Sequence, residues 1–170
     1  MKNVFYFAIM LLFVLNGCTS KTEVASPNSN IKWSLNLDDK GAITYQVTVN
    51  NQPFILPSAL GFEEKSGLNL KDGFQVVNTT FDSQDETWTQ PWGENKSIRS
   101  YYNEMAVNLQ NEAGVKLTVR VRAFDDGLGF RYEYDTPADS LLLMDEYTSF
   151  NIAEDGTSWS IPAEFNTYEL

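Results

Sequence analysis

The 170-residue chain has 12 Lys and Arg against 23 Asp and Glu, which gives a formal net charge of −11. This balance argues against nucleic-acid binding, because phosphate backbones are bound by clustered Lys and Arg. The chain has no histidine, which excludes a histidine-based triad and His-ligated zinc. Hydrophobic residues make up 42% of the chain, enough for the packed core of one domain.

Residues 1–17 are typical of a bacterial secretory signal. Lys2 provides a positive start, and an uncharged apolar run from Val4 to Leu15 follows. This run is too short for a permanent membrane-spanning helix. It ends in Leu-Asn-Gly-Cys, which resembles the lipobox of bacterial lipoproteins and implies cleavage before Cys18 and lipidation of its thiol. An ordinary signal peptide followed by an incidental cysteine is the alternative.

Cys18 is the single cysteine, so an intrachain disulfide is excluded, which is consistent with lipidation. Thr19 follows it where an aspartate would favour retention in the inner membrane. We therefore expect an outer-membrane lipoprotein that faces the periplasm, with its lipid anchor in the membrane. Residues 18–30 are rich in Ser, Thr, Asn and Pro and predict a flexible tether.

From Ile31 onward, apolar and polar residues alternate with the period of β-strands. The expected strands are residues 32–37, 43–49, 52–56, 74–80, 106–110, 115–124, 128–134 and 148–152. Turn signals separate them, among them the Asp-Asp-Gly of residues 125–127, which lacks the spaced oxygen ligands of an EF-hand calcium loop. Residues 140–147 could form a short turn. This pattern predicts an all-β, antiparallel β-sandwich over residues 31–170.

The segment around Trp88 and Trp92 contains Pro and Gly and lacks strand periodicity, which predicts a loop. Exposed tryptophan rings stack on sugar rings, and Glu94 lies beside them as a candidate for the same binding site. Two alternatives stay open for the tryptophans: packing against another domain, or burial in the core. For Glu94, Glu86 and Glu104, capping of turns or plain solvation are the alternatives to lining a sugar cleft.

Trp33 and Trp159 are expected in the core. Arg99 and Arg131 lie near acidic residues in the sequence and are expected to form structural ion pairs.

Several segments, taken together and in order, resemble the amino-terminal domain of glycoside hydrolase family 97. They are residues 33–35, 45–47, 51–58 and 60–61; residues 86–94 (ETWTQPWGE), 98–99 and 102–104; residues 122–132 (RAFDDGLGFRY); and residues 159–163 and 168–169. Single pieces of this set occur in other carbohydrate-active sandwiches, so the ordered set carries the resemblance.

The resemblance implies a galactose-mutarotase-like super-sandwich joined, in exported bacterial enzymes, to a (β/α)₈ barrel that hydrolyses α-glucosides or α-galactosides. In that family the catalytic carboxylates and a calcium ion lie in the barrel, and the amino-terminal domain contributes one calcium ligand. By its place in the motif, this ligand is Glu169. The barrel motifs are absent from the chain, so we assign no catalytic residue to it. We expect no activity and no tight calcium binding from the chain alone.

Two functions follow from these observations. The first is a non-catalytic domain that completes the active site of an exported α-glycosidase, with the barrel and an α-glucoside or α-galactoside as partners. The second is a free-standing lipoprotein that binds carbohydrate through the tryptophan segment and has no catalytic activity. The end of the chain at Tyr168-Glu169-Leu170, without a polar tail, favours the first.

Overall fold

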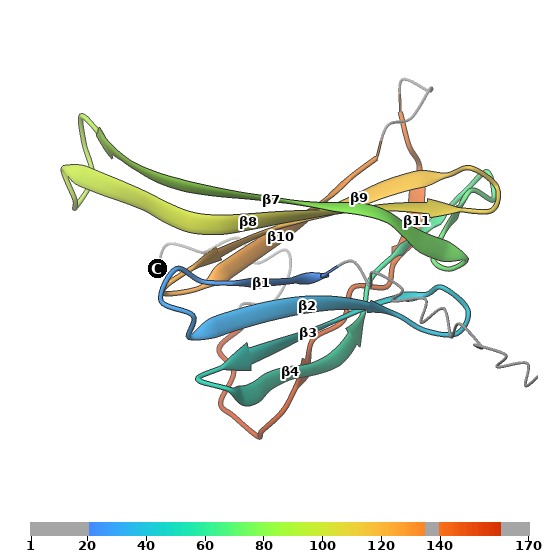
Figure 1. The fold of residues 1–170 in the computed structure, drawn as a ribbon, viewed down its shortest axis with the longest axis horizontal. Helices are drawn as coiled ribbons and strands as arrows, with labels where there is room; N and C mark the ends of the chain where they lie inside the picture. The colour runs from blue at the N-terminus through green and yellow to red at the C-terminus, as the bar shows by residue number, and fades with distance from the viewer. Residues whose placement is uncertain (1–20, 135–139, 161–170) are drawn as a thin grey trace, which may run out of the picture.

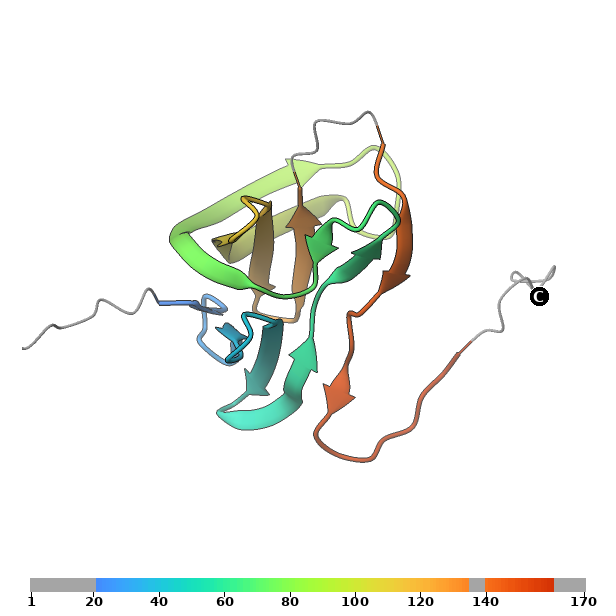
Figure 2. The same cartoon turned by 90° about the vertical axis from the view of Figure 1, so that its right-hand side faces the viewer.

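The computed structural model describes residues 21–134 and 140–160, which form twelve β-strands and no helix. Two antiparallel sheets lie face to face and a third, small sheet lies at one side (Figures 1 and 2). The predicted antiparallel β-sandwich is therefore confirmed. In these two ranges no helix is present that could cross a membrane. The signal segment, Cys18 and Glu169 lie outside the described residues.

The first sheet has the strand order β1-β2-β3-β4-β12. Its strands are β1 Glu23–Ala25, β2 Ile31–Leu37, β3 Ile43–Val49, β4 Gln52–Ala59 and β12 Asn151–Ile152. In the β2–β3 hairpin, Trp33 pairs with Val47 and Leu35 pairs with Tyr45, and all four side chains are buried. Because alternate residues of a strand point to the same face, the hairpin has one apolar face, which lies against the second sheet.

The second sheet has the strand order β10-β9-β8-β7. Its strands are β7 Phe74–Thr89, β8 Ser97–Asn111, β9 Lys116–Phe124 and β10 Leu128–Glu133. The inward side of β9 is the clearest case of the predicted alternation, since Leu117, Val119, Val121 and Ala123 are all buried. The Asp-Asp-Gly turn joins β9 to β10, and the amide of Phe124 donates a hydrogen bond to the carbonyl of Gly127 (2.8 Å). The predicted hairpin turn is therefore confirmed.

The small sheet has the strand order β11-β5-β6 and closes one side of the sandwich. Its strands are β5 Phe62–Glu64, β6 Asn69–Leu70 and β11 Leu143–Glu146. Phe62 contacts Tyr132 of β10 with ring centroids 4.4 Å apart, which joins this sheet to the second sheet. Residues 143–146 form a strand and not the short turn considered for residues 140–147, because their backbone pairs with β5.

The core is centred on aromatic rings from both large sheets. Trp33 stacks on Tyr45 at a centroid distance of 5.7 Å, and Tyr45 contacts Phe130 of β10 at 5.4 Å. The Tyr45 hydroxyl donates a hydrogen bond to the carbonyl of Ser149 (2.9 Å), which attaches the segment before β12 to the core. Aromatic pairs add to the stabilisation that the burial of their surface provides. The predicted core position of Trp33 is confirmed.

Residues 23–25 were expected in the flexible tether, but they form β1 and pair with β2. Val24 is buried, the Thr22 hydroxyl donates to the carbonyl of Leu35 (2.8 Å), and the carbonyl of Ala25 accepts from the Asn103 side chain (2.9 Å). Three residues with one large apolar side chain are too few to show a period. The strand therefore depends on long-range contacts that the local sequence does not reveal.

The expected core position of Trp159 is wrong, since its side chain is 92% exposed. It follows β12 in a segment without regular secondary structure, and no described strand pairs with that segment. A tryptophan is large and apolar, but its burial requires a neighbouring surface, and the described part of the sandwich provides none at this position.

Trp33→Ala is expected to lower the free energy of unfolding by about 3–5 kcal/mol, because it removes a fully buried ring at the contact between the sheets. Trp159→Ala, the matched control, should change it by less than about 0.5 kcal/mol. Urea unfolding followed by circular dichroism measures both values. Equal losses in the two variants would contradict this assignment of the core.

Candidate functional site

The β7–β8 hairpin extends beyond the rest of the sandwich (Figure 1). Strand β9 pairs with β8 only from Tyr102 to Gln110, whereas β7 and β8 continue to pair as far as Thr89 and Ser97. Residues 85–89 and 97–101 therefore form a two-stranded ribbon with no third strand from the described chain. We call this ribbon, with the connecting residues 90–96, the hairpin tip. An isolated two-stranded ribbon is marginally stable in water.

Both tryptophans lie at the hairpin tip, and so does Glu94. Trp88 is opposite Ile98 and is 47% exposed, while Trp92 lies in the connection and is 83% exposed. Neither is therefore a core residue of the described chain. Glu94 is exposed in the same connection, and it makes no ion pair with any residue of 21–134 or 140–160.

A loop was expected around Trp88, Trp92 and Glu94. The prediction is wrong for Trp88, which belongs to β7, and correct for Trp92 and Glu94. The ribbon has solvent on both faces, so its backbone ladder imposes no alternation of apolar and polar residues. Strand periodicity is for this reason absent from a segment that is a strand. Glu86 is also exposed on β7, whereas Glu104 lies on β8 in the body of the second sheet and is buried.

Arg99 forms a bidentate ion pair with Asp85 across the ribbon. Its Nε and Nη2 atoms each lie 2.7 Å from a carboxylate oxygen, and its guanidinium group lies 4.5 Å from the centre of the Tyr101 ring. The structural ion pair predicted for Arg99 is confirmed. The side chains of Arg99 and Asp85 are 59% and 50% exposed, so the pair adds little stability. It helps to hold the two strands in register.

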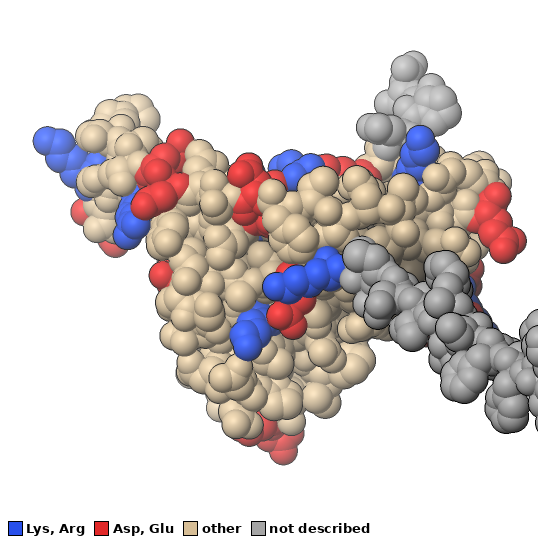
Figure 3. Space-filling view, viewed as in Figure 1, with Lys and Arg blue, Asp and Glu red and all other residues tan. Residues whose placement is uncertain are grey.

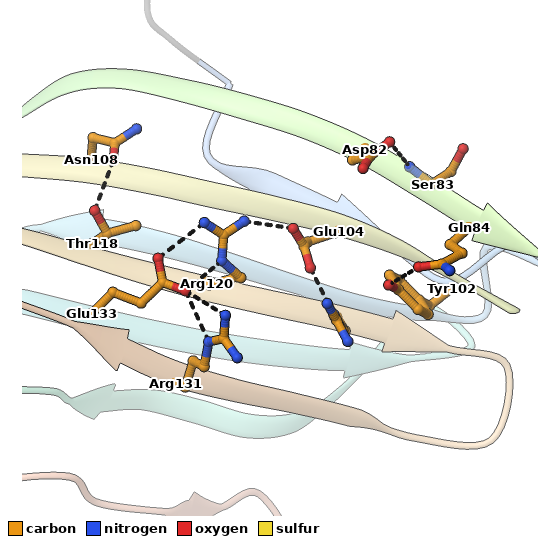
Figure 4. A network of polar contacts seen from close by, with 11 residues as sticks. Asp82, Ser83, Gln84, Tyr102, Glu104, Asn108, Thr118, Arg120, Arg131 and Glu133 are labelled. Atoms are coloured by element: carbon orange, nitrogen blue, oxygen red, sulfur yellow. Dashed lines mark hydrogen bonds and ion pairs between the residues drawn. The ribbon is translucent and has the colours of Figure 1, made fainter. Parts of the chain in front are cut away.

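A second polar cluster lies on the outer face of the second sheet (Figure 4). Glu104 accepts hydrogen bonds from Arg120 Nη1 (2.6 Å) and Arg122 Nε (2.7 Å). Arg120 also donates to Glu133 from Nε (2.6 Å) and Nη2 (3.0 Å). Arg131 donates to Glu133 Oε1 from Nη2 (2.7 Å), which confirms its predicted ion pair. We call these five residues the arginine cluster.

The arginine cluster keeps its carboxylates ionised. Hydrogen bonds from Arg120 and then Arg131 lower the pKa of Glu133 to about 2. Burial alone would raise the pKa of Glu104, but the hydrogen bonds and charges of Arg122 and Arg120 outweigh it, and the pKa is lowered. The pKa of Arg120 is raised by its hydrogen bonds to Glu133 and Glu104. The cluster is therefore a permanently charged assembly at neutral pH.

The sequence predicts an ion pair for Arg131 but not the rest of the cluster. A signal is present: Arg120 and Arg122 are two residues apart on one predicted strand, and Arg131 and Glu133 are two residues apart on the next. Since the turn at residues 125–127 joins these strands as a hairpin, all four side chains share a face. The pairing with Glu104 requires the register of β8 as well, which the sequence alone does not supply.

A hollow with a volume of about 600 Å³ lies at the other end of the sandwich from the hairpin tip. It is formed mainly by turns, and its lining residues are 37–41, 69, 73–75 and 111–113. Asp38 in its wall accepts hydrogen bonds from the amides of Lys40 and Ala42 (both 2.8 Å), so this carboxylate stabilises the turn. We assign no site to this hollow, because its polar groups serve the turns.

No group of three or more His, Cys, Asp or Glu side chains suited to a metal ion occurs among residues 21–134 and 140–160. Glu169, the expected calcium ligand, lies outside these ranges.

Acid should destabilise the protein through Glu133. Its pKa is about 2 in the folded chain against an ordinary value of 4.5, so its contribution is complete above pH 4.5 and is lost as the pH falls toward 2. We expect Glu133→Gln to be less stable than wild type at pH 7, and the two stabilities to converge toward pH 2. Urea unfolding at a series of pH values tests this. Glu86→Gln, which removes an exposed carboxylate, should follow wild type, and a Glu133→Gln profile parallel to wild type would contradict the assignment.

Comparisons with known proteins agree with this architecture. The family model described as Glycosyl-hydrolase 97 N-terminal matches residues 24–170. An enzyme named probable retaining alpha-galactosidase, from Streptomyces bingchenggensis (strain BCW-1), is 27% identical over 119 residues, which are 70% of this chain and 18% of that protein.

Solved structures give the same picture. A glycoside hydrolase family 97 enzyme from Pseudoalteromonas sp. strain K8, solved in complex with acarbose and also with panose, matches with a TM-score of 0.71 and 32% identity. The match covers 77% of this chain and 20% of that one. A β-arabinopyranosidase, with a TM-score of 0.69 at 22% identity over 76% of this chain and 21% of that one, shares the fold. This chain spans about a fifth of the length of these relatives. The sandwich and the ordered motifs along it are those of one family, and the chain belongs to the amino-terminal domain family of glycoside hydrolase family 97.

Proposed function

We propose that this chain is the non-catalytic amino-terminal domain of an exported α-glycosidase and that its hairpin tip helps to form the substrate-binding region of the complete enzyme. The observation that carries the proposal is the exposure of Trp88 and Trp92 on a ribbon that no third described strand supports. Exposed aromatic groups of this size mark surfaces that contact a ligand or another domain. The Pseudoalteromonas relative, solved with acarbose and panose, is an enzyme that binds such sugars.

The charge state of the carboxylates supports a non-catalytic role. Glycoside hydrolysis requires one carboxyl group that holds a proton at neutral pH, together with a second carboxylate. The pKa values of Glu104 and Glu133 are instead lowered, and arginines occupy their oxygens. Asp85 likewise has a lowered pKa beside Arg99. None of these three groups is suited to protonate a leaving group.

We also propose that Glu169 provides one ligand to a calcium ion in the complete enzyme and that Cys18 carries the lipid anchor of an outer-membrane protein. Calcium takes six to eight oxygen ligands, so one carboxylate requires further oxygens from the catalytic barrel. The position of Glu169 in the family motif supports the first role. The lipobox around Cys18 supports the second.

An antibody against residues 31–170 should detect, in the cells that produce the protein, a band several times heavier than the 19.3 kDa of this chain. The purified chain should show no turnover of aryl α-glucosides or aryl α-galactosides. A band near 19.3 kDa would contradict the proposal and favour the second candidate, a free-standing carbohydrate-binding lipoprotein. Titration of the chain with maltooligosaccharides would then test that candidate.

In the heavier enzyme, Trp88→Ala combined with Trp92→Ala should lower kcat/KM by about fivefold, because the loss of aromatic stacking costs on the order of 1 kcal/mol. Phe54→Ala is the matched control: Phe54 is exposed to a similar degree as Trp88 but lies on β4 of the first sheet. We expect the control to retain the wild-type kcat/KM. An unchanged value in the double variant would contradict a role of the hairpin tip in the active region.

A further inference from the structure

We propose that the outer face of the β9–β10 hairpin carries a binding site for a carboxylate-bearing sugar, a hexuronic acid, centred on Arg122 and Gly129. This site lies on the body of the second sheet and not at the hairpin tip. It does not depend on the role that we propose for the complete enzyme.

The pairing of β9 with β10 creates the site. Arg122 is directly opposite Gly129, and Arg120 is directly opposite Arg131. These four positions share the outer face of the sheet, because Val121 and Phe130 between them point into the core. Three corners of this square carry arginine side chains and the fourth carries none.

The absent side chain of Gly129 leaves a hollow. A Cβ atom added to Gly129 would have nothing within 4 Å, so the space above this residue is open. The hollow has a volume of about 190 Å³, and its lining residues are Arg120, Arg122, Phe124, Gly129, Phe130 and Arg131. This volume corresponds to about six water molecules at their volume in the liquid. It suits a single sugar unit better than a folded segment of a partner protein.

Two contacts hold the guanidinium group of Arg122, which lines the hollow. Its Nε donates to Glu104 (2.7 Å), and its guanidinium lies 4.5 Å from the centre of the Tyr102 ring. Its Nη1 and Nη2 atoms donate to no residue of 21–134 or 140–160, although the side chain is 45% exposed. Two parallel N–H groups on a fixed guanidinium are the donor pair that binds a carboxylate in a bidentate manner. Little side-chain entropy is lost when such a ligand binds.

The charge of the arginine cluster also favours an anion. It contains three guanidinium groups and two carboxylates, so one positive charge is not balanced within the cluster. This occurs in a chain whose formal net charge is −11. On the face shown in Figure 3, acidic and basic side chains lie close together and form no large patch of one sign. The unbalanced guanidinium charge is therefore a local feature, and one carboxylate would neutralise it.

Aromatic rings beside the hollow favour a sugar over a simple anion. Phe124 lines the hollow and contacts Tyr102 at a centroid distance of 5.1 Å. Sites for sugars combine an aromatic surface for the C–H face of the ring with a few polar groups that fix its orientation. A hexuronic acid presents both a ring face and a carboxylate. Inorganic phosphate and acetate present only the charge.

The test is calorimetric titration of the 170-residue chain with D-glucuronate and D-galacturonate at pH 7 and low salt. We expect saturable binding of at least one uronate with a Kd of about 1 mM, weakened as salt is added, and no detectable binding of D-glucose. Acetate, inorganic phosphate and a polyglutamate peptide serve as comparison ligands. Equal or tighter binding of any of them at the same concentration of charged groups, or no uronate binding, would overturn the proposal.

Two substitutions locate the site. Arg122→Gln should weaken uronate binding by at least about tenfold, since it removes the charged donor pair. Gly129→Val should do the same by filling the hollow, and it leaves the arginines in place and introduces a residue that strands accept. Gly127→Val is the matched control, because a side chain there also meets open space but lies in the turn outside the hollow. Thermal unfolding of each variant verifies the fold. Wild-type affinity in Gly129→Val would overturn the proposed location.

Discussion

The packing of Phe130 against Tyr45 and Trp33 determines what the opposite face of the second sheet presents to solvent. The ring lies 5.4 Å from Tyr45 and 6.4 Å from Trp33, between the two large sheets. Because neighbouring residues of a strand point to opposite faces, this contact places Gly129 and Arg131 outside. A shift of one residue would bring Arg131 into the aromatic core at a large cost in desolvation. The core thus sets the geometry of the arginine cluster.

The buried carboxylate of Glu104 connects this geometry to β8. Its side chain is only 10% exposed, and a carboxylate in such a position requires compensating charges. Arg120 and Arg122 supply them from the neighbouring strand, so Glu104 orients two guanidinium groups at once. Arg122 is fixed through one edge of its guanidinium, and the edge that faces away from Glu104 is available to a ligand. The contact between Glu104 and Arg122 therefore stabilises the sheet and also holds the guanidinium group of Arg122 in position for a ligand.

Sequence periodicity predicted long strands whose two faces differ, but it missed the short strand β1 and the outer half of β7, whose faces are alike. Strand β9 was predicted because four of its residues alternate into the core, from Leu117 to Ala123. The outer half of β7 was not predicted as a strand, because Trp88 and its neighbours have solvent on both sides. Of the arginine cluster, the sequence predicted an ion pair for Arg131. The partners of Glu104 depend on the register between β8 and β9, which emerges only from the folded sheet. The exposure of Trp159 likewise depends on which surfaces surround it.

The hairpin tip extends beyond the core, so the residues proposed to contact a ligand there are separate from the residues that stabilise the fold. Trp92 and Glu94 lie in a connection whose ends are joined by the hydrogen bond from the Gln90 amide to the Lys96 carbonyl (3.1 Å), so the loop closes on itself without support from the core. Changes of sequence or length within it leave the packing of Trp33, Tyr45 and Phe130 untouched. Substitutions within the loop therefore change the stability of the sandwich little. For protein engineering, the same property makes residues 91–95 a position where substitutions can change ligand recognition without unfolding the sandwich.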